Sequence, residues 1–120
     1  MNNNIRIRMI GSQSDVALIK IRGFLDTVSA YHLQQKCDDL IKKGTYKYII
    51  DCEYLDYISS AGIETFHSMA QRLQKHNGEI IFTNVSAKIH KLFKLIGTTT
   101  FFQVKNTVQE AAKELESHEQ

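Results

Sequence analysis

The spacing of hydrophobic residues changes several times along the chain, and the first segment has a period of two. Ile5, Ile7 and Met9 alternate with the charged residues Arg6 and Arg8. Successive side chains of a strand point to opposite faces of a sheet, so this alternation predicts a half-buried β-strand. One face of such a strand should meet a core.

A second strand is predicted close behind the first. The segment 11–15 is rich in turn residues (Gly, Ser, Gln, Ser and Asp), and the apolar run 16–21 follows at once, with Gly23 ending it. Parallel strands need a long crossover, whereas antiparallel strands are joined by a short turn. The two strands are therefore expected to form an antiparallel hairpin.

Beyond Gly23 the apolar residues take up the spacing of helices. Four groups have this spacing: Ala30, Leu33, Cys37, Leu40 and Ile41; Ala61, Phe66, Met69, Ala70 and Leu73; Ile89, Leu92, Phe93 and Ile96; Val108, Ala111, Ala112 and Leu115. Stop signals follow the first three groups at Gly44, Asn77-Gly78 and Gly97, and Thr107 with Glu110 is a capping box for the last. Short strands are predicted between the helices at 46–51, 80–82 and 101–104.

The predicted fold class is α/β, in the order strand, strand, helix, strand, helix, strand, helix, strand, helix. Alternation of strands and helices requires a mostly parallel sheet, here with one antiparallel edge strand. Residues 1–120 should form one domain with four helices, with a flexible tail at 1–4 and a frayed end at 117–120. Functional residues of such sheets gather at the carboxyl ends of strands, which are the predicted loops 23–28, 52–60 and 84–86.

Composition narrows the classes of function. Hydrophobic residues are 42% of the chain and charged residues 23%, and 15 Lys and Arg face 13 Asp and Glu, for a net charge of +2. No run of like charge is present, which argues against a nucleic-acid partner. Cys37 and Cys52 lack the spacing of a zinc site or a disulfide framework, so no metal is expected. Without an apolar leader or a membrane-length apolar run, the expected location is the cytoplasm.

Little in the sequence indicates an enzyme, and the prediction is that the protein is not one. No GxSxG, HExxH, GxxxxGK[ST] or GxGxxG motif is present, and each of the five histidines falls within or at the end of a predicted helix, as a solvated residue would. A receiver-like protein or small enzyme that uses Asp51 remains an alternative, because Asp51 ends a central strand. Phosphoaspartyl chemistry also needs a magnesium site, for which Asp26 is the one acid in the expected place. The simpler interpretation is that Asp51 orders the following loop.

The junction before the second helix carries two adjacent hydroxyls, on Ser59 and Ser60. A serine here is a typical helix cap. Gly62 in the first turn is unusual, since glycine costs about 1 kcal/mol relative to alanine in a helix, and its use suggests a close approach to the backbone. A helix N-terminus also favours a phosphate, because free amides and the helix dipole stabilise negative charge. A modifiable serine therefore fits the junction as well as a cap does.

Several stretches resemble, in order, the signatures of STAS domains, and specifically those of stand-alone bacterial anti-sigma factor antagonists. They are Gly23-Phe24-Leu25-Asp26, Ile49-Ile50-Asp51, Tyr57-Ile58-Ser59-Ser60-Ala61-Gly62-Ile63, Asn84-Val85-Ser86, the Gly97 stop and the helix start from Thr107 to Ala111. The resemblance covers nearly the whole chain. The resemblance rests on the order and spacing of these stretches taken together, and it implies a STAS fold.

The resemblance implies a phosphorylated serine. In the family this serine follows an aspartate in a pattern like Asp-Ser-Ala-Gly, which places it at Ser60, with Ala61 and Gly62 completing the motif. Ser59 stands where the family has aspartate, and it is a second candidate. The partner-binding neighbourhood would further include Ile63 and Asp26, with Asp26 as the remaining acidic neighbour or as a cap for the first helix.

The resemblance also implies partner switching. The unphosphorylated protein would bind an anti-sigma factor that is also a serine kinase, and so release a sigma factor. The kinase would phosphorylate Ser60 with its own ATP, so no cofactor is expected here, and a serine phosphatase would reset the protein. A STAS subunit of another assembly, such as a sensor complex or a transporter ATPase, is an alternative in which the serine need not be modified. The oligomeric state stays open.

Overall fold

The computed structural model describes residues 4–95 and 102–117. In chain order its elements are β1 Ile5–Ile10, β2 Val16–Ile21, β3 Gly23–Leu25, α1 Thr27–Lys42, β4 Lys47–Asp51, β5 Leu55–Ile58, α2 Ser60–Gln74, β6 Glu79–Thr83, α3 Ala87–Leu95, β7 Gln103–Lys105 and α4 Val108–Ser117. The predicted helix stop at Ile96 and Gly97, the strand start at Phe101 and the terminal residues 1–3 and 118–120 lie outside the described residues. Asn4, assigned to the tail from the sequence, donates a hydrogen bond to the Phe24 carbonyl at 3.1 Å.

The main sheet has five strands in the order β1-β2-β4-β6-β7. β1 is antiparallel to β2, and the other neighbours are parallel. This arrangement confirms the predicted α/β fold with an antiparallel edge strand. The four helices are also confirmed, and no helix in the described ranges is long and apolar enough to cross a membrane.

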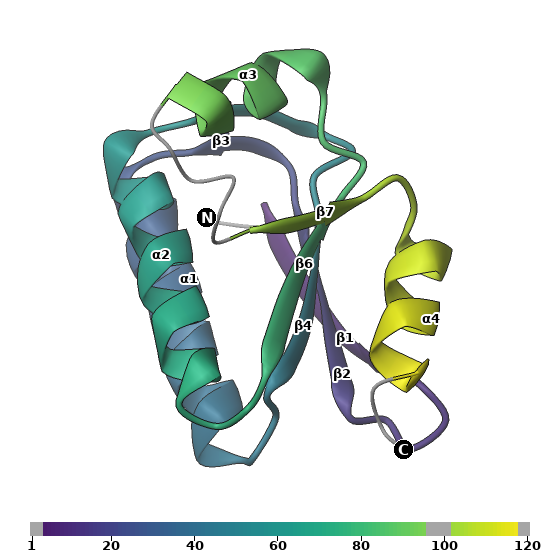
Figure 1. Ribbon diagram of the computed structural model, residues 1–120. Helices are drawn as coiled ribbons and strands as arrows, with labels where there is room; N and C mark the ends of the chain where they lie inside the picture. The colour runs from purple at the N-terminus through teal and green to yellow at the C-terminus, as the bar shows by residue number, and fades with distance from the viewer. Residues whose placement is uncertain (1–3, 96–101, 118–120) are drawn as a thin grey trace.

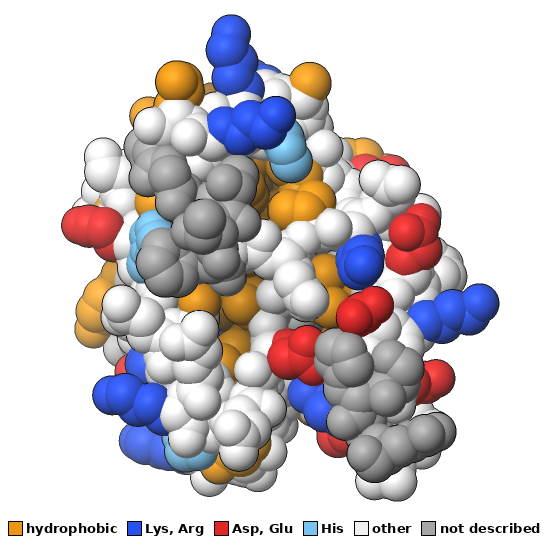
Figure 2. Space-filling view, in the orientation of Figure 1, with side chains coloured by type: hydrophobic (Ala, Val, Ile, Leu, Met, Phe, Trp, Pro, Cys, Tyr) orange, Lys and Arg blue, Asp and Glu red, His pale blue; other side chains and the backbone are white. Residues whose placement is uncertain are grey.

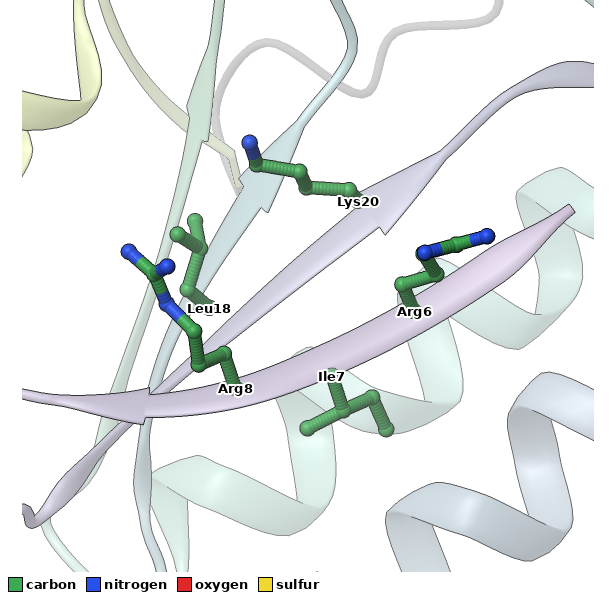
Figure 3. Close-up of a pocket in the computed structure, with 5 residues that line it drawn as sticks. All are labelled: Arg6, Ile7, Arg8, Leu18 and Lys20. Atoms are coloured by element: carbon green, nitrogen blue, oxygen red, sulfur yellow. The ribbon is translucent and has the colours of Figure 1, made fainter.

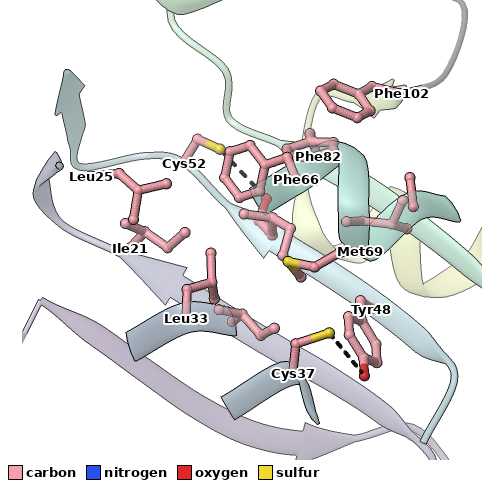
Figure 4. Packing of buried hydrophobic residues seen from close by; sticks show 14 of the residues in the cluster. Ile21, Leu25, Leu33, Cys37, Tyr48, Cys52, Phe66, Met69, Phe82 and Phe102 are labelled. Atoms are coloured by element: carbon pink, nitrogen blue, oxygen red, sulfur yellow. Dashed lines mark hydrogen bonds between the residues drawn. The ribbon is translucent and has the colours of Figure 1, made fainter. Parts of the chain in front are cut away.

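The helices cover the two faces of the main sheet unequally. In Figure 1, α1 and α2 lie side by side on one face, α4 lies on the other, and α3 crosses the end of the sheet near β3. The core under α1 and α2 is rich in large side chains, among them Tyr48, Phe66, Met69, Phe82 and Phe102 (Figure 4). The smaller core under α4 is built from Val16, Leu18, Ile49, Ile81, Ala111 and Leu115.

A second sheet was missed by the sequence prediction, which treated residues 23–28 and 52–60 as loops. β3 and β5 lie within those segments and pair in parallel, with Leu25 opposite Ile58. They are 3 and 4 residues long and their register shifts between Gly23 and Phe24. Strands this short show no alternation to detect, but they bury Leu25 and Ile58 and set the positions where α1 and α2 begin.

Charge is distributed unevenly on the face that Figure 2 presents. Positive side chains gather over α3, where Lys88, Lys91 and Lys94 are exposed, while both signs are mixed over α4. The small net charge of the chain is therefore the sum of regions that differ in local charge.

Candidate functional site

The candidate site lies where the small sheet ends and α2 begins. β5 ends at Ile58, and the Ser59 amide donates a hydrogen bond of 2.9 Å to the Leu25 carbonyl of β3. Ser59 is the N-cap of α2, and its hydroxyl oxygen accepts a hydrogen bond of 3.1 Å from the Gly62 amide. The expectation that a serine caps this helix is thus confirmed, and the residue concerned is Ser59.

Ser60 occupies a different environment although it is the next residue. It is the first residue of α2, and its side chain is exposed. Among the residues that the structure describes, its hydroxyl has no hydrogen-bond partner. The sequence could not separate the two serines, because both are good caps. The structure assigns the capping bond to Ser59 and leaves the Ser60 hydroxyl available at the surface.

Gly62 is buried, and the close approach inferred from its position is made by the protein itself. A Cβ added here would lie 2.8 Å from Ile58 Cγ1 and 2.9 Å from Leu25 Cδ2. Both distances are shorter than van der Waals contact, so a side chain at this position would force Ile58 and Leu25 to shift, and glycine lets the first turn of α2 pack on β3 and β5 without that shift. Its neighbours Ala61 and Ile63 are half-buried.

Asp26 begins α1 beside this corner. Its carboxylate accepts hydrogen bonds of 3.0 Å from the Ser29 amide and from the Ser29 hydroxyl, and the Ser29 hydroxyl oxygen accepts one of 2.9 Å from the Asp26 amide. The bond from the Ser29 amide, followed by the bond from its hydroxyl, holds the pKa of Asp26 below its ordinary value. The predicted capping role is confirmed.

Two helix N-termini therefore meet at one edge of the small sheet. Asp26 directly follows Leu25, and Ser59 directly follows Ile58, which is the residue paired with Leu25. Each N-terminus presents amides and the positive end of a helix dipole. The N-terminus of α2 therefore favours a negative group at Ser60, whereas the Asp26 carboxylate already occupies the N-terminus of α1.

A hollow next to Ser60 extends the site toward α3. It has a volume of about 330 Å³ and is lined by Tyr57, Ile58, Ser59, Ser60, Ile63, Glu64 and Leu92. Beside it, the exposed rings of Phe24 and Tyr57 pack edge to face with their centroids 5.8 Å apart. The sequence placed Phe24 and Tyr57 in the candidate loops 23–28 and 52–60 but did not single out either ring, and it did not place Leu92 beside Ser60. Phe24 and Tyr57 lie on the undetected short strands, and Leu92 was assigned to the core stripe of its helix.

The side chain of Asp51 is held by hydrogen bonds to neighbouring loops. It is buried at the end of β4, and its Oδ1 accepts a hydrogen bond of 3.1 Å from the Glu53 amide and one of 3.0 Å from Asn84 Nδ2. The interpretation that Asp51 orders the following loop is confirmed. Across residues 4–95 and 102–117, no cluster of three or more His, Cys, Asp or Glu side chains has the geometry of a metal site.

The fold and the site together define a small α/β domain with a surface serine at the meeting point of two helix N-termini. The chain belongs to the STAS domain family, whose model matches residues 8–111. Curated relatives are anti-sigma factor antagonists. The chain is 27% identical over 92 residues to BtrV of Bordetella bronchiseptica, which is assigned to that class, covering 77% of this chain and 79% of BtrV. It is 25% identical over 104 residues to the anti-sigma-B factor antagonist of Staphylococcus aureus, covering 87% of this chain and 94% of the relative.

Solved structures agree with this fold. The anti-sigma factor antagonist SpoIIAA in its unphosphorylated form superposes with a TM-score of 0.76 at 19% identity, covering 94% of this chain and 97% of SpoIIAA. The phosphorylated form of the Bacillus protein superposes with a TM-score of 0.75 at 21% identity, covering 92% and 98%. At this identity the likeness concerns the fold.

Proposed function

We propose that the protein is an anti-sigma factor antagonist that binds an anti-sigma factor through the surface around Ser60 while Ser60 is unphosphorylated. The observation that carries the proposal is the exposed Ser60 hydroxyl, which has no hydrogen-bond partner in the described part of the chain and lies at the start of α2 beside an apolar hollow. The names of the relatives support the same class. On this proposal the protein acts in the cytoplasm by binding, and catalysis is supplied by its partners.

Phosphorylation would switch the binding off. A partner serine kinase would transfer the γ-phosphoryl group of its own ATP to Ser60 Oγ, so that an O–P bond forms at Ser60, ADP leaves, and the hydroxyl proton passes to the kinase. The new group carries a charge of about −1.5 to −2. A dianion buried unpaired in a contact costs several kcal/mol, and each 1.4 kcal/mol is about tenfold in affinity. A serine phosphatase would restore binding by hydrolysis.

The position of Ser59 explains how the site tolerates its departure from the family pattern. Aspartate and serine are comparably good N-caps, so Ser59 keeps the bond to the Gly62 amide that a family aspartate would make. What changes is charge, because a neutral hydroxyl replaces a carboxylate next to Ser60. The acceptor serine is thereby free of one repulsive neighbour when it becomes a phosphoserine.

The test is to incubate the protein with its cognate kinase and ATP and to map the phosphate by peptide mass spectrometry. Phosphate is expected on Ser60, absent in Ser60→Ala and retained in the matched Ser59→Ala variant. Kinase binding by Ser60→Asp should be weaker than by Ser60→Ala, by about tenfold or more. Phosphate on neither serine, or on Ser59 alone, would overturn the proposed switch.

A further inference from the structure

A group of cations lies on the outer part of the main sheet, away from the Ser60 corner. Arg6 and Arg8 lie on one face of β1, and Lys20 of β2 is directly opposite Arg6. Figure 3 shows these three long side chains on the same side of the two strands, with Ile7 on the other side. Together with Ile7 and Leu18 they line a hollow of about 340 Å³.

These cations are not neutralised by the fold. Like charges directly opposite each other on neighbouring strands are destabilising, and Arg6 faces Lys20 in this way. Within the described part of the chain, Arg6, Arg8 and Lys20 form no ion pair. The carboxylates of Asp51 and Glu53 line a neighbouring hollow that Arg6 and Lys20 also border. Arg8 is not among the residues that line this second hollow.

The strand that carries the arginines is also the edge of the described sheet. The Arg22 amide donates to the Asn4 carbonyl at 2.8 Å, and Asn4 and Arg22 continue the β1–β2 register, so the even-numbered residues of β1 turn their backbone groups toward β2. The amides and carbonyls of Ile5, Ile7 and Met9 therefore point outward. Such an edge is a template on which an extended segment adds as a further strand.

We propose that β1 receives an extended acidic segment of a partner protein, which adds to the sheet as a strand and places carboxylates over Arg6 and Arg8. Residues two apart on a strand lie on one face about 6.8 Å apart. Acidic residues at alternate positions of the segment thus match the spacing of the arginines. The hollow beside Lys20 gives these carboxylates room on the same face.

A second copy of this chain is a poor occupant of the same edge. If two β1 strands paired in antiparallel fashion about Ile7, Arg6 of each copy would lie opposite Arg8 of the other. Such pairing sets like charges against each other and is destabilising. The same arginines thus disfavour self-association and favour an acidic partner. The surface shares no residue with the Ser60 corner, so the proposal stands apart from the proposed function.

The test uses the full-length ¹⁵N-labelled protein and a capped peptide of alternating Val and Glu, with a peptide of alternating Val and Lys as control. On saturation with the Glu peptide, hydrogen exchange at the Ile5, Ile7 and Met9 amides should slow by about tenfold or more. Amides of Arg6 and Arg8, already bonded to β2, should change little. The Lys peptide should leave all of them unchanged.

The double variant Arg6→Gln/Arg8→Gln should bind the Glu peptide about tenfold or more weakly. Lys36→Gln/Lys113→Gln removes the same charge from exposed positions on α1 and α4 and should bind as the wild type does. The melting temperature of the arginine variant should not fall, because a repulsive pair is removed. The proposal would be overturned if that variant bound the Glu peptide as tightly as the wild type, or if the Glu peptide failed to protect the three amides. Equal protection by tripolyphosphate or by an oligothymidylate would overturn it as well.

Discussion

At the scale of single residues, the two adjacent serines have separate roles. Ser59 fixes the start of α2 through its bond to the Gly62 amide, and its own amide is bonded to Leu25. Ser60, exposed at the first helical position, takes no part in this capping bond. The residue that holds the corner in shape and the residue proposed for modification can therefore be changed independently.

The serines should differ in their effect on stability. Ser59→Ala removes a cap and is expected to lower the free energy of unfolding by about 1 kcal/mol. Ser60→Ala removes an exposed hydroxyl and should stay within about 0.5 kcal/mol of the wild type. Urea unfolding followed by circular dichroism measures both. Equal losses in the two variants would contradict the assignment of the capping bond.

Asp26 should make stability depend on pH at the acid end. Its folded-state pKa lies below its ordinary value because of the bonds from Ser29. The stabilisation is therefore present above about pH 4, where the unfolded-state group is ionised, and is lost as pH falls through the folded-state value.

The variant Asp26→Asn keeps a capping oxygen without a titratable group, so it should flatten this part of the pH dependence. Urea unfolding between pH 2 and pH 6, with direct titration of the Asp26 carboxyl by NMR, checks the prediction. A carboxyl that titrates above its ordinary value would contradict it.

At the scale of elements, the short sheet of β3 and β5 positions the site. It ends beneath the first turn of α2, where Leu25 and Ile58 pack against Gly62. It also sets the starts of α1 and α2 side by side, since Asp26 and Ser59 follow directly on paired residues. A substitution that alters this packing should therefore change the structure around Ser60 more than it changes the main sheet.

Alanine at Gly62 and at Gly78 should both destabilise the protein, to different extents. At Gly62 the added methyl meets side chains, so overpacking of about 1–3 kcal/mol is partly offset by the better helix propensity of alanine, about 1 kcal/mol. At Gly78 it would lie 2.2 Å from the Tyr46 carbonyl oxygen, which belongs to the backbone and cannot rotate away.

The loss for Gly78→Ala should therefore exceed that for Gly62→Ala in urea unfolding. Gly62→Ala should additionally shift the NMR signals of Ser59 and Ser60, whereas Gly78→Ala, near the other end of α2, should leave those signals in place. A Gly62→Ala protein more stable than the wild type would contradict the packing argument.

The longer elements were predictable because each carries either an amphipathic pattern, as the helices and β1 do, or a continuous apolar run, as β4 and β6 do. Four apolar stripes, such as that of α2 from Phe66 to Leu73, gave the helix count, and the order of strands and helices gave the sheet type. β3 and β5 were not predictable, since their pairing depends on a contact between segments about thirty residues apart in the sequence. The Ser60 motif could be found from the sequence, but the hollow beside it depends on that same contact.

At the scale of the whole molecule, the main core lies between the sheet and the pair α1 and α2, and both cysteines are inside it. Cys37 Sγ lies 3.8 Å from the Tyr48 hydroxyl. Burial raises the pKa of Cys37, and it raises the pKa of Cys52 to about 12. Neither thiol is available as a thiolate in the folded protein near neutral pH.

Both thiols should therefore react with an aromatic disulfide reagent at pH 8 only when the protein unfolds. The reaction followed by absorbance should show one slow phase that accounts for two thiols and accelerates with added urea. Denatured protein serves as the control and should react at once with the same amplitude. A fast phase in the native protein would contradict the burial of that cysteine.

Composition could not reveal how charge is arranged over the molecule. A net charge of +2 gave no reason to expect a basic surface. The antiparallel register places Arg6 against Lys20, and this pairing brings together charges that are fourteen residues apart in sequence. The local charge of a surface thus depends on which strands are neighbours in the sheet, and the net charge of the chain contains no information about that.

If Ser60 is phosphorylated as proposed, the modification also has a consequence for the lifetime of the protein. Degradation of a folded domain tracks how often it opens, and a phosphate at a helix N-terminus stabilises rather than weakens that helix. The modified form would therefore be cleared no faster than the unmodified one. The phosphorylated protein would persist, and a phosphatase would restore its proposed binding to the anti-sigma factor in a single hydrolysis step, without new protein synthesis.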